Sequence, residues 1–480
     1  MNKKLLIGGM LAAILSGCAT IVPQAGFTDV EKQVAQRIDK RVQWRTDGAE
    51  DQEVDARIDE MLQKELDVEQ AVQIGLLNNP RLQATYEELA IAQADLVQAG
   101  LLANPVFDAA VLYPSGGNKP DIDLAISQDF LSIFYLPLRK RFAENQFEAA
   151  KLKVTAEVVS LAGEVRETFY RNQAASQTLE LFDEVVRNTS ASFVAAQELY
   201  EAGNITDLAL AQERSAYEES RLQLAQAEAD LLVQRERLNR LMGLSGAQTQ
   251  WSMSPRLPEL PADTLDTADL EKRAIAANLA LAAQRNAIIA AANRAGLVNA
   301  TALIPDLEIG VQGEREEAWE VGPSVRLQIP IFDLGQARRL EARAELRRAR
   351  AEYAAQAIAI RSAVRASYAA LASARDRAIF VRDVFLPLRS RIVGQALLQY
   401  NAMQLGVFQL LIAQRDQIAA ARQYIETLRE YWVARAGLQQ THVGGVVSGE
   451  PMTAGRDSAA PEIDTEEPSG ILSGETSPAR

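Results

Sequence analysis

Cysteine and histidine most often carry nucleophilic or metal chemistry, and this chain of 480 residues has one of each, Cys18 and His442. A lone Cys cannot form an internal disulfide or a CxxC motif, and a lone His cannot build a zinc finger or an HExxH site. The sequence also has no Gly-rich phosphate loop and no GxSxG motif. We therefore expect that the protein is not an enzyme and holds no cofactor or metal.

The residues before Cys18 give its thiol another role. Lys3 and Lys4 precede an apolar run that ends in Leu-Ser-Gly-Cys18, the order of a cleaved export signal. This run is too short to span a bilayer as a helix. Leu-Ser-Gly-Cys resembles the bacterial lipobox, which implies cleavage after residue 17 and acylation of Cys18, with palmitate as a typical chain. The alternative is an ordinary signal peptide with an incidental Cys. By resemblance to bacterial lipoproteins, Ala19 in place of Asp favours sorting to the outer membrane.

Composition excludes one class of partner and indicates unusual elements. The chain has 64 acidic and 50 basic side chains, a net charge of −14, whereas nucleic-acid binding draws on clustered Lys and Arg. We therefore expect no nucleic-acid partner. Gly and Pro number only 27 and 17, and most of them lie in a few clusters. The stretches between clusters are far longer than an average helix of about 11 or 12 residues.

These stretches predict very long helices. Residues 138–198 contain no Pro and a single Gly, Gly163, so they would form a rod of about 90 Å. The counterpart at 335–399 is interrupted by Pro387 and Gly394, and we expect a kink or short break at 385–387. Helices at 207–241 and 407–439 would fold back as hairpins. The alternative, purely structural interpretation of this pattern is a long antiparallel coiled coil that serves as a spacer.

The same landmarks occur twice, which indicates a duplication. Asn79 and Asn278, Pro105 and Pro305, Tyr200 and Tyr400, and Gln212 and Gln414 are offset by 199, 200, 200 and 202 residues. Such an internal repeat governs the fold more than any local element does. The predicted segments are a signal peptide (1–17), a lipid-anchored N-terminal segment (18–67), a first repeat (68–244), a linker (245–266), a second repeat (267–440) and a disordered acidic tail (441–480).

Each repeat contains a short region of alternating polar and apolar residues, at about 105–130 and 305–331. Period-two alternation predicts strands, one hairpin in each repeat. Strands with one apolar face fit a tilted crossing of an outer membrane, although a soluble sheet packed on helices shows the same pattern. The polar residues predicted to face a barrel lumen are Asp123, Glu308, Gln312, Arg326 and Gln328.

Four strands cannot close a transmembrane barrel, whose smallest bacterial examples have about 8. Open strand edges in lipid would leave backbone groups without partners. If the strands span the membrane, the chain must therefore oligomerise. Two copies would supply 8 strands around a filled interior, and three would supply 12 around a wider lumen.

Several motifs in this duplicated arrangement resemble the TolC-like outer membrane efflux proteins, in particular the outer membrane factor lipoproteins. They are Leu-Tyr-Glu-Ala-Gly-Asn-Ile-Thr-Asp-Leu at 199–208, Ile-Pro-Ile-Phe-Asp at 329–333 and Phe-Leu-Pro-Leu at 385–388. The resemblance covers about 68–438. It implies a mainly α fold with a small membrane β part: a homotrimer with a 12-stranded outer-membrane β-barrel, continued by a long α-helical barrel across the periplasm.

The resemblance also implies the function and partners. Such proteins are exit ducts of tripartite efflux or type I secretion systems, which passively conduct substrates from a periplasmic adaptor (membrane fusion) protein and an inner-membrane pump to the exterior. A lipid-anchored coiled-coil scaffold without a pore is the alternative. The periplasmic tips that meet the adaptor would be two turns, although such turns also simply cap helices. The tip residues are Gly203, Asn204, Ile205, Thr206, Gln404, Leu405, Gly406 and Val407.

The second turn departs from the first, because Met403 stands where the first turn has Gly203. The resemblance places a periplasmic gate near the end of the second long helix, where this chain has Gln395, Gln399 and Tyr400. No acidic pair stands out there. Arg415 and Asp416 on the return helix are adjacent in sequence, and we interpret them as part of a solvated surface.

Overall fold

The computed structural model describes residues 22, 24–46, 48–113, 120–261, 269–301, 307–315, 318–329 and 331–445. The predicted signal peptide, Cys18 and the residues from 446 onward lie outside the described residues. The chain separates into the units Met1–Val447 and Ser448–Arg480, and all described residues belong to the first.

The described part of the chain shows one element order twice. The first repeat contains α4 (Val68–Asn78), α5 (Pro80–Ala99), β2 (Val106–Leu112), β3 (Asp121–Asp129), α6 (Leu131–Glu201) and α7 (Asp207–Met242). The second contains α8 (Leu270–Ala277), α9 (Leu279–Thr301), β5 (Leu307–Arg315), β6 (Trp319–Leu327), α10 (Gln336–Phe380), η2 (Val381–Phe385), α11 (Leu386–Asn401) and α12 (Val407–His442). The helix α12 therefore continues two residues past the boundary predicted at residue 440.

An asparagine interrupts the first helix of each repeat at the same place. Asn79 adopts an extended backbone between α4 and α5, and its Oδ1 accepts hydrogen bonds from the N–H groups of Arg81 and Leu82. Asn278 between α8 and α9 caps in the same way, because its Oδ1 accepts from the N–H of Leu281. These side chains satisfy donors that a helix N-terminus leaves without partners. Asn79 and Asn278, which are offset by 199 residues, thus cap the N-terminus of the corresponding helix in each repeat.

The long helices are longer than the sequence predicted. The 71 residues of α6 correspond to about 107 Å, and α6 begins before Pro137, which lies inside it. In the second repeat, the interruption expected near Pro387 is the π-helical turn η2, which ends directly before α11. Proline lacks an N–H group, and a π turn is one of the ways in which a long helix accommodates it.

The two hairpins form one antiparallel sheet in the order β2-β3-β5-β6. Strand β3 pairs with β5 from the other repeat, with Asp123 opposite Glu314 and Ile126 opposite Val311. The pairing leaves β2 and β6 as outer strands, each with a described neighbour on one side only. The sheet is therefore open, and no closed barrel exists within the described residues of one chain.

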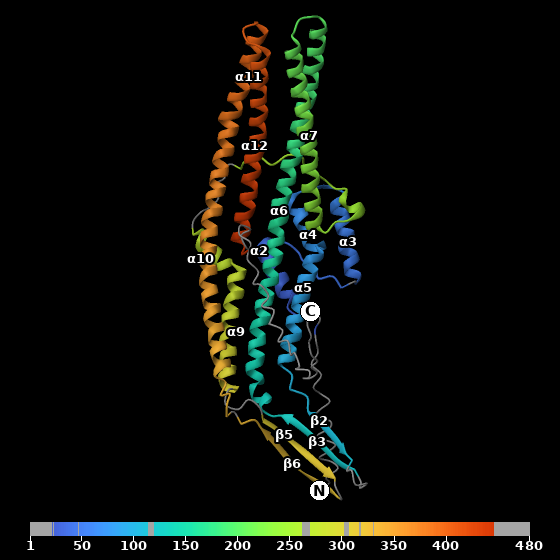
Figure 1. Ribbon diagram of the computed structural model, residues 1–480, viewed down its shortest axis with the longest axis vertical. Coiled ribbons are helices and arrows are strands. Elements are labelled where there is room, and N and C mark those ends of the chain that lie inside the picture. The colour runs from blue at the N-terminus through green and yellow to red at the C-terminus, as the bar shows by residue number, and fades with distance from the viewer. Residues whose placement is uncertain are drawn as a thin grey trace, which may run out of the picture. The chain divides into compact units, whose positions relative to one another are not determined.

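The helices lie in a single layer that continues from the sheet (Figure 1). Near the sheet the contact order is α5–α6–α9–α10, and farther from it the order is α7–α6–α12–α10. Thus α5 and α7 form one edge of the layer, and α10 forms the other. The edge with α5 carries the outer strand β2, which follows α5, and the edge with α10 carries β6, which precedes α10.

A segment before the first repeat packs on the helical layer. It contains α2 (Phe27–Ile38), α3 (Ala49–Leu62) and β1 (Glu65–Leu66), and β1 pairs in parallel with β4 (Ser252–Met253). The Trp44 ring contacts the rings of Phe27 and Tyr86 at 5.7 and 6.1 Å between centroids, inside the main apolar cluster. Trp44, the bulky residue of the predicted N-terminal segment, therefore anchors this segment to the first repeat.

Charged contacts tie this segment to both repeats. The Arg37 guanidinium donates to the carbonyl oxygens of Ala277 and Val443, both at 2.7 Å, where α8 and α12 end. Burial alone would raise the pKa of Glu69 in α4, but hydrogen bonds from Arg166 and Lys40 outweigh burial and lower this pKa. A cation at two helix C-termini is favourable because it meets the negative ends of the helix dipoles.

None of the described helices is by itself both long and apolar enough to cross a membrane. The pair α8 and α9 meets the length and composition criteria only together, across a bend of 52°.

We expect Asn79→Ala to lower the free energy of unfolding by about 1–3 kcal/mol, because it removes a helix cap and a buried hydrogen-bond donor. The Nδ2 group of Asn79 donates to the Leu241 carbonyl at 2.8 Å. The measurement is denaturant unfolding of the detergent-solubilised protein, followed by far-UV circular dichroism. Asn145→Ala is the matched control, because Asn145 is only half-buried and its Nδ2 group donates to the Arg141 carbonyl of its own helix. Equal effects of the two substitutions would contradict the role assigned to Asn79.

Candidate functional site

The sheet brings most of the predicted lumen residues to one face. Residues directly opposite each other in an antiparallel pair point to the same side. Asp123 lies opposite Glu314, Glu308 opposite Arg326, and Gln312 opposite Ala125 and Gly322. Asp123, Glu308, Gln312 and Arg326 therefore share a face. Gln328 lies one residue beyond the end of β6.

This shared face is strongly acidic. Asp123, Glu314 and Glu320 form a row across β3, β5 and β6. Arg326 donates to Glu308 at 2.7 Å. Like charges directly opposite each other destabilise a sheet unless water surrounds them. The carboxylates on this face are Asp108, Asp121, Asp123, Asp129, Glu308, Glu314 and Glu320.

The opposite face of the sheet is apolar and uncovered. Large apolar side chains line it, and single exposed ones would be ordinary, whereas a contiguous apolar face marks a contact surface. Its exposed members are Phe107, Val111, Ile126, Ile309, Val311, Trp319, Val321, Val325 and Leu327. The sheet therefore has one acidic face and one largely apolar face.

Two tight turns lie at the end of the helices away from the sheet (Figure 1). In the first turn, the N–H of Gly203 donates to Tyr200 O and the N–H of Asn204 donates to Leu199 O. In the second, the N–H of Met403 donates to Tyr400 O and the N–H of Gln404 donates to Gln399 O. The two turns thus have the same hydrogen-bond pattern despite the Gly-to-Met difference.

Met403 adopts the left-handed conformation that the pattern requires, with φ 57°, and its side chain is 95% exposed. An L-residue other than Gly, Asn or Asp pays roughly 1–2 kcal/mol for this conformation. The turns also start their second helices differently. Thr206 Oγ1 accepts from the N–H of Ala209 at 3.2 Å, whereas Gly406 has no side chain to cap α12.

The second hairpin also differs from the first in charge. No Asp, Glu, Lys or Arg occurs from Ile392 to Gln414, whereas Glu198, Glu201 and Asp207 surround the first turn. Large exposed apolar side chains occur on this uncharged tip. They are Ile392, Leu397, Leu398, Met403, Phe408 and Ile412.

The predicted gate residues lie on the second hairpin. Gln395 and Gln399 are exposed, and Tyr400 packs beside Ala396 and Leu410. Within the described residues, the polar links that hold helices together start farther from the tip. Arg389 on α11 donates to Asp416 on α12 at 2.7 Å, and Arg415 donates to Glu219 on α7 at 3.1 Å.

Our interpretation of Arg415 and Asp416 as merely solvated is therefore wrong. Each side chain reaches a different helix, because adjacent residues on a helix point about 100° apart. The sequence contained one signal for the Arg389–Asp416 pair. The two residues are equally far along the chain from the turn between Ala402 and Met403, so they lie at the same level of the antiparallel hairpin. Glu219 comes from the other repeat, and no local spacing identifies it.

A cleft of about 680 Å³ separates the hairpin of α6 and α7 from α12. Its walls include Glu219, Ser220, Arg415 and Ile418. Thr189 Oγ1 and Ser220 Oγ lie 2.8 Å apart and join α6 to α7 at this level. Closer to the first turn, burial raises the pKa of Glu213 on α7. The ion pair of Arg415 with Glu219 joins the two hairpins beside this cleft.

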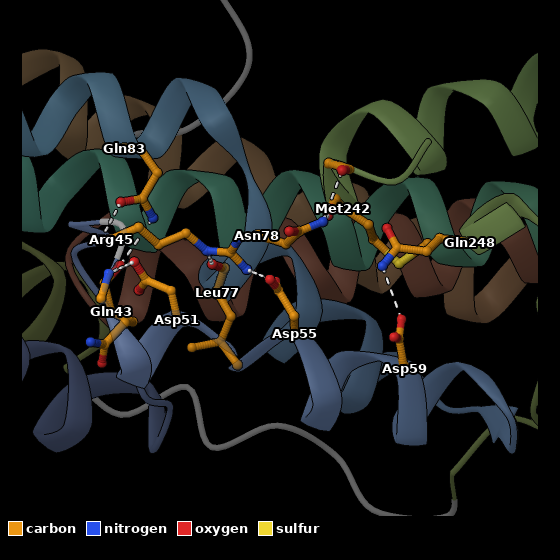
Figure 2. A network of polar contacts seen from close by, with 12 residues as sticks. Gln43, Arg45, Asp51, Asp55, Asp59, Leu77, Asn78, Gln83, Met242 and Gln248 are labelled. Atoms are coloured by element: carbon orange, nitrogen blue, oxygen red, sulfur yellow. Dashed lines mark hydrogen bonds and ion pairs between the residues drawn. The ribbon is translucent and has the colours of Figure 1, made fainter. Parts of the chain in front are cut away.

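A polar network positions α3 at the edge formed by α5 and α7 (Figure 2). Arg45 donates to Asp55 of α3 at 2.8 Å and to the Leu77 carbonyl at 3.3 Å. Gln248 donates to Asp59 at 3.0 Å, and Asn78 donates to the Met242 carbonyl at 3.1 Å. In Figure 1, α3 accordingly lies beyond α7, on the side of the layer away from α10.

Three comparisons with known proteins agree with this architecture. Residues 71–244 match the family model of the outer membrane efflux protein. The cobalt-zinc-cadmium resistance protein CzcC of Cupriavidus metallidurans is 23% identical over 387 residues, which cover 77% of this chain and 88% of CzcC.

Solved structures share the fold at low identity. A crystal structure of CusC gives a TM-score of 0.66 at 18% identity and covers 79% of this chain and 92% of that chain. The Campylobacter jejuni CmeC outer membrane channel gives 0.66 at 16% identity, with 80% and 87% covered. The open state of the Neisseria gonorrhoeae MtrE outer membrane channel gives 0.64 at 15% identity, with 79% and 89% covered.

The family match lies on the first repeat, and the shared fold extends over both repeats with the sheet and hairpins described above. The first repeat thus resembles the outer membrane efflux proteins by sequence, and the chain has the fold of the solved outer membrane channels.

Proposed function

We propose that the protein is the outer-membrane exit duct of a tripartite efflux or type I secretion system, and that it conducts substrates passively as a homotrimer. The observation that carries this proposal is the pair of open edges. The strand β2 and the helices α5 and α7 are open on one side, and β6 and α10 are open on the other. Both open edges run from the sheet into the helical layer, so a single partner can cover sheet and helices together.

The repeat supports a second copy of the chain as this partner. Leu82, Val158 and Val165 lie together in the core of the first repeat, and Leu281, Ala357 and Val364, each 199 residues later, lie together in the second. The two repeats therefore superimpose with an offset of 199 in this region. The contact between the repeats, α6 against α9, is then a template for the contact that α10 would make with α5 of the next copy.

Burial supports this template. Val159 on α6 is 1% exposed because it packs near Leu279 of α9, but its counterpart Ile358 on α10 is 67% exposed. Ala290 on α9 is 5% exposed, but its counterpart Ile91 on α5 is 63% exposed. A second copy placed head to tail would bury Ile358 and Ile91 as the first contact buries Val159 and Ala290.

Head-to-tail contacts generate a ring when the rotation closes. Three copies would join their sheets into a 12-stranded barrel, with the apolar faces toward outer-membrane lipid and the acidic faces toward the lumen. Asp123, Glu308, Gln312, Arg326 and Gln328 would line that lumen. The number three rests on the family, and the helices would continue the barrel as a periplasmic tube.

The tips would meet a periplasmic adaptor, which links the duct to an inner-membrane pump. Both turns, 203–206 and 404–407, lie at the end of the helices farthest from the sheet (Figure 1). The gate would involve Gln395, Gln399 and Tyr400 near the second turn. Because this tip carries no charge from Ile392 to Gln414, its closed form would depend on apolar and amide contacts.

The membrane anchor would be the acylated Cys18, with residues 18–67 leading to the first repeat and residues 441–480 forming the C-terminal tail. Residues 441–445 are described and belong to the end of α12 and its turn. The cobalt-zinc-cadmium resistance protein CzcC is a relative by sequence. A passive conduit has no substrate pocket from which its cargo is read, so the cargo would be set by the pump.

We expect the purified oligomer to form pores in planar bilayers. Well-folded oligomers that insert into the bilayer but give no conductance would contradict the proposed duct function and favour a coiled-coil scaffold. Far-UV circular dichroism before and after reconstitution is the control for folding. A scaffold predicts helical oligomers without a membrane-inserted β component, which infrared spectroscopy of the reconstituted protein would detect.

We expect Cys18→Ser to abolish incorporation of radioactive palmitate in a lipoprotein-processing host. The chain has one Cys, so any label that remains in the variant contradicts the assigned acylation site. Ser16→Ala is the matched control, because it alters the export signal by one atom and leaves the thiol in place.

We expect a photo-cross-linking amino acid in place of Met403 or Gly203 to capture a second protein, the adaptor, in host envelopes. The same group in place of Leu222, which is exposed on α7 away from the turns, is the control. Captured species are identified by mass spectrometry. Adducts at 403 and 203 that contain only this chain would contradict adaptor contact and leave the ring intact.

A further inference from the structure

Arginine is concentrated on α10, the helix at one open edge of the layer. Its 45 residues contain ten Arg and no Lys, against four carboxylates, Glu341, Glu345, Glu352 and Asp376. The protein as a whole has the opposite balance, with a net charge of −14. An excess of positive charge on one helix of an acidic chain indicates a surface that faces negative charge.

Four of these arginines have no partner among the described residues. Arg338, Arg348 and Arg365 pair with carboxylates, and Arg339 binds backbone carbonyls. Exposed arginines without any hydrogen-bonded or ionic partner lie on the same helix. They are Arg343, Arg347, Arg350 and Arg361.

The other open edge carries the opposite charge. The 14 residues of α3 contain six carboxylates and one Arg. Ion pairs inside the chain involve two of the six, since Asp55 pairs with Arg45 and Glu60 pairs with Lys64. The helix α5 contains three carboxylates, Glu87, Glu88 and Asp95, and one Arg, Arg81. Glu53 and Asp95 are exposed, and the described residues provide neither with a partner.

We propose that the arginines of α10 bind the acidic edge formed by α3 and α5 of a second copy, so that charge steers and aligns the closure of the ring. This inference rests on the proposed ring and adds to it the contact surface and its chemistry. Opposite potentials on two docking surfaces raise the rate of encounter and fix their register. The same surfaces repel when two basic or two acidic edges meet, which disfavours wrong pairings.

The positions of the charged groups along the helices agree with this contact. We call the distance of a residue from the sheet, along the helical layer, its height. Lys153 on α6 pairs with Glu88 on α5, and the counterpart of Lys153 on α10 is Glu352. Glu88 thus lies at the level of Lys153, and a rotation that carries one repeat into the next would place Glu88 of the second copy at the level of Glu352 and Arg350. Asp95 lies two helical turns nearer the sheet, at the height of Arg343 and Arg347.

The helix α3 stands higher, at the level of α4. Arg365 on α10 pairs with Glu271 of α8, whose counterpart in the first repeat is Val72 of α4. Arg361 is one helical turn from Arg365 and therefore faces the level at which α3 packs on α4. Glu53 and the other outward carboxylates of α3 are thus at the height of Arg361 when a second copy closes on α10.

The test is a charge reversal on each edge and on both. Arg347→Glu/Arg361→Glu reverses the basic edge, and Glu53→Arg/Asp95→Arg reverses the acidic edge. We expect each double variant to raise the protein concentration for half-assembly by about tenfold or more at low salt, because like charges then oppose. We expect the four-fold variant to return to near the wild-type value. Mass photometry of the detergent-solubilised protein measures the oligomer fraction.

Arg187→Glu/Arg422→Glu is the matched control, because it changes the same charge on α6 and α12, which have helix neighbours on both sides. This control is expected to assemble like the wild type, and the low-salt effect of the edge variants should shrink in 1 M salt. Edge variants that assemble normally overturn the proposal, and so does a four-fold variant that fails to recover. A wild type that stays monomeric overturns the ring itself, whereas a ring indifferent to these reversals overturns only the charge pairing.

Discussion

The unpaired backbone edges of β2 and β6 are the constraint on which the rest of the molecule depends. A four-stranded sheet with one apolar face can enter lipid only if both edges find hydrogen-bond partners, since each unsatisfied group costs several kcal/mol there. The helical layer is open on the same two sides, from α5 and α7 to α10. A partner that satisfies the strands must therefore also fit the helices, and a second copy of the chain would do both by repeating the contact between its own two halves.

The duplicated asparagine turns show how the sequence builds a layer with two such edges. Asn79 and Asn278 end one helix and cap the next at the same place in each repeat. The second helix of each pair can then follow its long neighbour down to the sheet. The N-terminal segment stabilises the junction, because Arg37 joins α2 to the ends of α8 and α12. The apolar core of the first repeat lies at the level of this junction.

Sequence alone predicted the elements well, because the signals for them are local. Long stretches without Gly or Pro gave the helices, period-two alternation gave the hairpins, and Pro387 gave the interruption that became η2. Tertiary partners were harder. Arg415 looked solvated, since nothing near it in sequence points to Glu219 in the other repeat. The helices α2 and α3 were also missed, because residues 18–67 were assigned only as a leading segment.

The turn at Met403 has a backbone conformation that its residue type does not indicate. Met403 stands where the first turn has Gly203, yet the hydrogen bonds of the two turns are the same and Met403 adopts a left-handed backbone. Sequence could not reveal this, because the flanking helices impose the turn and their packing at Ala396 and Leu410 offsets the local cost. Such a residue persists at an exposed tip when its side chain has a use there.

The two hairpins are joined by both polar and apolar contacts. The ion pair Arg415–Glu219 joins α12 to α7, and an exposed pair of this kind contributes only about 0–1 kcal/mol. Arg389–Asp416, in contrast, holds α11 to α12 within one hairpin. Apolar packing adds to the ion pair between the hairpins, because Phe182 and Val185 of α6 cluster with Ile418 of α12 beside the cleft.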